Sequence, residues 1–127
     1  MMPSVLIVDD NQEFRGVVKH LLAEDPSVRI LGEAEDGDEA VELATRAPVD
    51  VVLMDITMPR LNGIEAARRI KAERPNAKII LVTIHAEEAY EQAAEEIGAE
   101  ALLAKKDLTA SLLPTIRWVV TEEGRTQ

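Results

Sequence analysis

Short apolar runs alternate with amphipathic segments along this chain, and that alternation limits its possible folds more than any other feature. The runs lie at residues 5–8, 28–32, 49–54, 79–82 and 101–104. Short apolar runs bounded by polar residues are typical of strands buried in a parallel sheet. Between them, apolar residues recur at the three- and four-residue spacing of helices. The pattern therefore predicts right-handed strand–helix–strand units around one parallel sheet.

The expected helices are defined by this spacing and by proline and glycine. The first carries Phe14, Val17, Val18 and Leu21 on one face and ends before Pro26. The others are expected within 38–47, from 64 to the residues before 75, within 87–97 and within 109–121.

Two residues give more local detail. Gly98 stands where a helix C-cap is expected. Pro114 is expected in the first turn of the last helix, where its missing N–H costs nothing.

Five such units predict the flavodoxin-like fold, a (βα)5 doubly wound parallel sheet with strand order 2-1-3-4-5. The 127 residues are expected to form a single domain, with a frayed tail at 122–127.

Composition excludes several function classes. A formal net charge of -10 argues against non-specific nucleic-acid binding, and three aromatic residues (Phe14, Tyr90, Trp118) are too few for a base-stacking platform. Without cysteine there is no disulfide framework and no thiolate metal site. No run is long enough to span a membrane and no signal-peptide pattern opens the chain, so we expect a cytoplasmic protein.

Polar side chains gather where the predicted strands end. Asp9 and Asp10 follow the first strand, Asp55 ends the third, Thr83 ends the fourth and Lys105 follows the fifth. The carboxyl ends of parallel strands meet at one edge of the sheet, where ligands of such folds bind. The alternative is that these acids are solvated turn or cap residues that never converge.

The charges in this group need a counterion. Two carboxylates about 4 Å apart repel by about 4 kcal/mol at an effective dielectric of 20. Lys105 supplies one positive charge for three carboxylates, so we expect a divalent cation with oxygen ligands, and Mg²⁺ fits best. The acidic loop Asp9-Asp10-Asn11 would also repel the phosphate of a flavodoxin-type mononucleotide.

These motifs, in this order, resemble the receiver domain of two-component response regulators over nearly the whole chain. They are Val8-Asp9-Asp10, Met54-Asp55 with Met58-Pro59 and Asn62-Gly63, Val82-Thr83, and Lys105 after Gly98-Ala99. Gly32-Glu33-Ala34 and Leu103-Ala104-Lys105 are most similar to the NarL/FixJ subfamily.

The resemblance implies a role for each site residue. Asp55 would be the nucleophile that takes a phosphoryl group from a sensor histidine kinase or a small-molecule donor. Asp10, Asp55 and the backbone carbonyl of Thr57 would bind Mg²⁺, with Asp9 acting through water. Lys105 and the Thr83 hydroxyl would contact the phosphoryl group.

The resemblance also implies how the signal would leave the domain. Phosphorylation would change the face formed by the fourth helix, fifth strand and fifth helix. This change would alter a partner or homodimer surface and control transcription through a helix-turn-helix output domain absent from this chain. The receiver domain itself would be a regulatory phosphoacceptor rather than an enzyme, and it would bind neither nucleic acid nor membrane directly.

Three residues depart from the family pattern. Leu102 stands where receivers usually carry Tyr or Phe, Ile84 where a small residue is common, and His85 is expected to be a solvated loop residue. Leu102 and Ile84 support an alternative, a pseudo-receiver that binds proteins without being phosphorylated. A third hypothesis, a haloacid-dehalogenase-type phosphatase, would need a second carboxylate where Thr57 stands.

Overall fold

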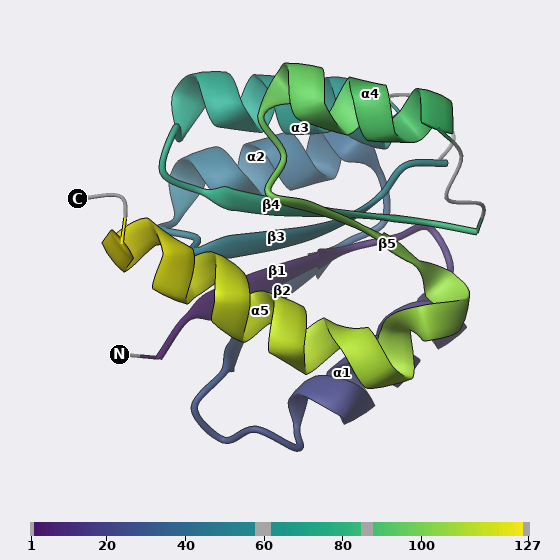
Figure 1. Cartoon of the computed structure of the whole chain (residues 1–127), viewed down its shortest axis with the longest axis vertical. Coiled ribbons are helices and arrows are strands. Elements are labelled where there is room, and N and C mark those ends of the chain that lie inside the picture. Colours follow the sequence, from purple (N-terminus) through teal and green to yellow (C-terminus); the bar gives the residue numbers. More distant parts are fainter. Residues whose placement is uncertain (1, 58–61, 85–87, 126–127) are drawn as a thin grey trace.

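The chain forms a five-stranded parallel sheet with helices on both faces, as the computed structural model in Figure 1 shows. The structure describes residues 2–57, 62–84 and 88–125. The strands are β1 (Ser4–Val8), β2 (Arg29–Ala34), β3 (Val51–Asp55), β4 (Lys78–Thr83) and β5 (Ala101–Ala104). The helices are α1 (Gln12–Leu22), α2 (Gly37–Arg46), α3 (Gly63–Glu73), α4 (Glu88–Ile97) and α5 (Leu108–Arg125), with a 3₁₀ turn at Lys105–Asp107.

The strand order is β2-β1-β3-β4-β5, and every neighbouring pair is parallel. The predicted flavodoxin-like topology is therefore confirmed. Element bounds differ from the predictions mainly at their ends. β3 begins at Val51, two residues later than expected, and α5 continues to Arg125, beyond the expected end at Thr121.

Successive apolar side chains of a strand point to opposite faces of the sheet, so the core is divided into two clusters, one on each side of the sheet. Val5, Ile7, Val51 and Leu53 face the side covered by α1 and α5. The intervening residues of the same strands face the helices α2, α3 and α4, as the layers in Figure 1 show. Because side chains of a strand point alternately to opposite faces, this pattern also fixes the face that a residue at a strand end occupies.

Two details of the helix predictions are wrong. Val17 was expected on the apolar face of α1 but is 52% exposed, whereas Val18 and Leu21 face the core as predicted. Pro114 lies inside α5 rather than in its first turn, since the helix begins at Leu108. Pro114 is on the exposed side of α5, where water can bond the backbone carbonyl that the proline leaves without a partner.

Gly98 and Gly63 occupy positions that a residue with a side chain would fit poorly. Gly98, after α4, has a φ of 80°, the left-handed conformation that ends many helices, so the predicted C-cap is confirmed. Gly63, the first residue of α3, lies against the end of β3. A Cβ atom there would lie 2.0 Å from the backbone oxygen of Asp55, so this position admits no side chain.

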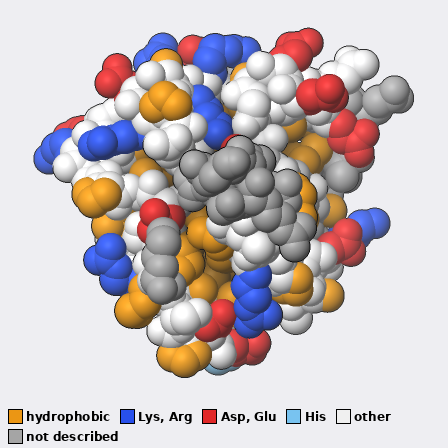
Figure 2. All heavy atoms as spheres, turned by 60° about the vertical axis from the view of Figure 1, so that its left-hand side comes forward, with side chains coloured by type: hydrophobic (Ala, Val, Ile, Leu, Met, Phe, Trp, Pro, Cys, Tyr) orange, Lys and Arg blue, Asp and Glu red, His pale blue; other side chains and the backbone are white. Residues whose placement is uncertain are grey.

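β1 begins and α5 ends on the side of the molecule away from the carboxyl ends of the strands (Figure 1). On the face that includes this side, charged side chains of both signs are interspersed with apolar ones (Figure 2). Within the described residues, no helix is both long and apolar enough to cross a membrane.

Gly63→Ala should lower the free energy of unfolding by about 3 kcal/mol or more, because the added methyl group would displace the backbone at Asp55. Gly16→Ala is the matched control, since a Cβ at this position inside α1 meets nothing within 4 Å. This control should raise the free energy of unfolding by about 0.5–1 kcal/mol. Urea denaturation measures both effects, and equal stability of the two variants would contradict the close approach at Gly63.

Candidate functional site

The sheet register places Asp9 and Asp55 next to each other at the edge where the strands end. Val8 of β1 pairs with Met54 of β3, so the residues that follow them lie at the same level on neighbouring strands. Asp9 and Asp55 also continue the set of side chains that faces α1 and α5. The strand pairing therefore brings two carboxylates together on one face of the sheet.

Asp9 is almost completely enclosed, with only 1% of its surface exposed. Its Oδ1 accepts a hydrogen bond of 2.8 Å from the backbone N–H of Asn11, and its Oδ2 lies 2.8 Å from Lys105 Nζ. The Arg15 guanidinium donates a 2.5 Å bond to the backbone carbonyl of Asp9 and forms a 2.9 Å ion pair with Glu33. These contacts fasten the end of β1 to α1 and β2.

Asp55 is 4% exposed, and its negative charge is compensated less fully than that of Asp9. Its Oδ2 lies 3.8 Å from Lys105 Nζ, and its Oδ1 accepts a 3.3 Å hydrogen bond from the Thr57 N–H. Burial and the neighbouring Asp9 carboxylate raise the pKa of Asp55 to about 7, and Asp10 adds to this effect. Lys105 and the Thr57 N–H oppose the rise in the pKa but do not cancel it.

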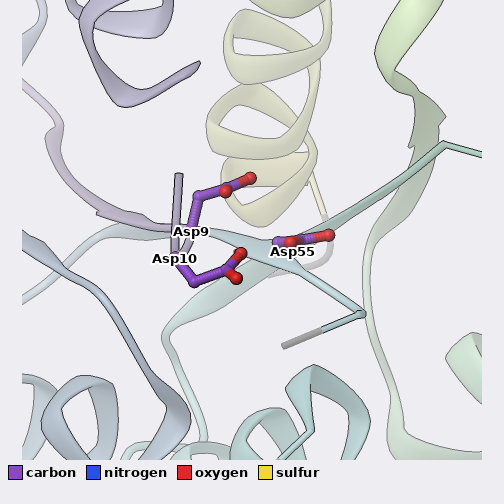
Figure 3. Close-up of side chains that lie close together, drawn as sticks. All are labelled: Asp9, Asp10 and Asp55. Carbon is purple, nitrogen blue, oxygen red and sulfur yellow. The ribbon is translucent and has the colours of Figure 1, made fainter. Parts of the chain in front are cut away.

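Asp10 completes a cluster of three carboxylates. It is exposed, and its oxygen lies within 4.8 Å of one oxygen each from Asp9 and Asp55. Figure 3 shows the three side chains gathered at the ends of β1 and β3. Oxygens that share one Mg²⁺ at about 2.1 Å lie at most roughly 4 Å apart, so small side-chain adjustments would let this cluster hold a hard cation.

Comparison with known proteins identifies the family of the chain. Residues 5–117 match the model of the response regulator receiver domain. The chain belongs to this family.

Relatives of this receiver domain include transcription regulators. The chain is 38% identical over 120 residues to the transcriptional regulatory protein DegU of Brevibacillus brevis. That alignment covers 94% of this chain but 50% of DegU, so the receiver domain spans about half the length of this relative.

Solved structures agree with this assignment. A LuxR-family response regulator from Aurantimonas sp. SI85-9A1 superposes with a TM-score of 0.91 at 30% identity, covering 96% of this chain and 87% of that one. The receiver domain of the putative NarL regulator from Mycobacterium tuberculosis gives a TM-score of 0.84 at 30% identity, with 90% and 92% of the two chains covered. The resemblance to the NarL/FixJ subfamily is thereby confirmed.

The other positions singled out in the sequence differ in their burial. Thr83 is buried at the end of β4, and Leu102 packs half-buried on the sheet face covered by α2, α3 and α4. Ile84 is 63% exposed. Pro59 and His85 lie outside the described residues, so their predicted places are not addressed by the structure.

Two contacts of the site were missed by the sequence reasoning. The ring of Phe14 lies 4.1 Å from Lys105 Nζ, and Arg15 binds the Asp9 carbonyl. Phe14 was assigned only to the apolar face of the first helix. No sequence signal separates a core phenylalanine from one that lies over a lysine more than ninety residues away.

The raised pKa of Asp55 predicts how stability depends on pH in the metal-free protein. The unfolded chain releases this proton near pH 3.8, whereas the folded protein keeps it until about pH 7. Unfolding between these values releases a proton, so stability falls as pH rises through this window, by on the order of 1 kcal/mol per pH unit. Asp55→Asn removes this loss and should be more stable than wild type at pH 8 but not near pH 4.

Urea denaturation in EDTA at several pH values measures this difference. Glu24→Gln, at an exposed carboxylate after α1, controls for the change in net charge. Parallel curves for wild type and Asp55→Asn across the whole range would contradict the prediction.

Proposed function

We propose that this receiver domain takes a phosphoryl group on the Asp55 carboxylate, from the phosphohistidine of a sensor histidine kinase or from a small-molecule donor. The observation that carries the proposal is the buried Asp55 at the carboxyl edge of the sheet, with Asp9, Asp10 and Lys105 around it. Family membership supports the same role.

In the proposed reaction, a carboxylate oxygen of Asp55 forms a bond to phosphorus. The bond from phosphorus to the donor nitrogen or oxygen breaks, and the leaving group keeps the electron pair. The Lys105 ammonium, already 3.8 Å from Asp55 Oδ2, would bind a phosphoryl oxygen, and the Thr83 hydroxyl would donate a hydrogen bond to another. The receiver domain would catalyse no other reaction than its own phosphorylation and dephosphorylation.

Mg²⁺ is the cation that we propose for the acidic cluster. Asp10, Asp55 and the backbone carbonyl of Thr57 would hold it, and Asp9 would act through water. Since both Asp9 oxygens are already in contact with Asn11 and Lys105, the exposed Asp10 is better placed to be a direct ligand. When bound, the ion neutralises negative charge, so that a carboxylate and a phosphoryl group can approach each other.

The proposed consequence of phosphorylation is a change on the surface of α4, β5 and α5, which would bind a partner or a second copy of the domain. Residues 1–127 would act as one domain. In a longer protein, a DNA-binding output domain would couple this change to transcription, as the likeness to DegU suggests. Since response regulators typically act in the cytoplasm, we propose that location here.

Phosphorylation is tested by measuring the intact mass after incubation with acetyl phosphate, with and without Mg²⁺. We expect a single phosphoryl adduct that requires Mg²⁺ and is absent from Asp55→Asn. Asp38→Asn, which removes an exposed acid of α2, is the matched control and should be labelled like wild type. An unlabelled wild type would instead favour the phosphorylation-independent interaction module, for which Leu102 and Ile84 are the motivating residues.

Metal binding is tested by thermal unfolding in the absence of any phosphoryl donor. At a hundred times its dissociation constant, Mg²⁺ should stabilise the folded domain by about 2.7 kcal/mol. Asp10→Asn should weaken this effect by at least tenfold in affinity, whereas Asp38→Asn should not change it. Equal Mg²⁺ affinity of Asp10→Asn and wild type would exclude Asp10 as a ligand.

A further inference from the structure

Phe14 is the only phenylalanine in the chain, and its ring lies against the Lys105 ammonium. The Lys105 Nζ is 4.1 Å from the ring centroid, well within the range of a cation–π interaction. Phe14 comes from α1 and Lys105 follows β5, so this contact joins two elements that the sheet alone does not bring together.

Two further residues, Asp9 and Asn11, complete a closed circuit of contacts with this pair. Asp9 Oδ1 accepts the N–H of Asn11, and Asn11 Oδ1 accepts the N–H of Phe14 at 3.0 Å. The Phe14 ring faces Lys105 Nζ, which returns to Asp9 Oδ2 at 2.8 Å. The N-cap of α1 therefore fixes the ring and the first acid relative to each other, and the ammonium lies between them.

The ring gives the ammonium a favourable partner in addition to the carboxylates of Asp9 and Asp55. The Lys105 side chain is only 20% exposed, so few water molecules can replace such a partner. The negative face of an aromatic ring attracts a cation, and it does so more strongly where water is excluded. An aliphatic side chain of similar size would fill the same space but leave the ammonium poorly solvated on that side.

We propose that Phe14 is a positioning residue, whose ring holds the Lys105 ammonium within reach of both Asp9 and Asp55. This inference rests on the proposed function, because Lys105 must meet the phosphoryl group on Asp55. In this proposal Phe14 takes no part in the phosphoryl transfer itself. It acts through Lys105.

Phe14 also packs against the cluster shared by α1 and α5, so a purely structural role has to be separated from positioning. Phe14→Leu keeps an apolar side chain but removes the aromatic face, whereas Phe14→Tyr keeps the face. With saturating Mg²⁺, the rate constant of phosphorylation by acetyl phosphate should fall roughly 3- to 30-fold in Phe14→Leu. It should stay within about twofold of wild type in Phe14→Tyr. Val17→Ala, on the exposed face of the same helix, should leave the rate unchanged.

Two readouts do not depend on phosphorylation. In proton–carbon NMR spectra of lysine-labelled protein, the Lys105 ε-CH₂ signal should be shifted upfield by the ring current, and Phe14→Leu should remove this shift while Phe14→Tyr keeps it. In urea denaturation, Phe14→Leu should cost less stability in a Lys105→Ala background than in wild type, because the two residues are coupled.

The outcomes separate this inference from the proposed function. If wild type is not labelled, the proposed function fails, and the NMR shift and the coupling still decide whether the ring holds the ammonium. If wild type is labelled, equal rates in Phe14→Leu and wild type would overturn the inference. An equal decrease of the phosphorylation rate constant in Phe14→Leu and Phe14→Tyr would overturn it as well. So would additive effects of Phe14→Leu and Lys105→Ala on the free energy of unfolding.

Discussion

Repulsion between the carboxylates of Asp9 and Asp55 is the interaction on which the rest of the site depends. Strand pairing fixes these residues on neighbouring strands, so they cannot separate without breaking the sheet. Both are buried, where charges interact more strongly than in water. The site relieves the repulsion in two ways, by pairing Lys105 closely with Asp9 and by favouring the protonated form of Asp55 when no metal is bound.

This unequal compensation gives the acids different properties. Asp9 Oδ1 accepts the Asn11 N–H, and its Oδ2 lies 2.8 Å from the Lys105 ammonium without a hydrogen-bond partner of its own among the described residues. Asp55 lies farther from the ammonium, and Asp10 is open to solvent. The Lys105 ammonium therefore compensates Asp9 more than Asp55, and Asp10 is solvated by water. Gly63 keeps the end of β3 in place, since α3 begins directly against the Asp55 backbone.

The sequence was sufficient to predict the topology and the group of residues at the sheet edge, because both follow from periodicity. Apolar runs of strand length define the sheet, and residues that end parallel strands share one edge. It could not predict which acid Lys105 approaches more closely, since that depends on side-chain conformations. Nor could it place Phe14, because a helical apolar pattern does not show which residue packs over a charge. The start of α5 was predicted to within one residue, so Pro114 was misplaced only because residue 114 lies beyond the first turn of a helix that begins at 108 or 109.

The position of the chain ends has a practical consequence for linking this domain to anything else. β1 begins, and the last turn of α5 lies, on the side away from the acidic edge (Figure 1). A tether, a fluorescent tag or a solid support joined on that side would leave the acidic edge of the sheet uncovered. A second protein could therefore approach the acidic edge while the domain stays attached on its opposite side.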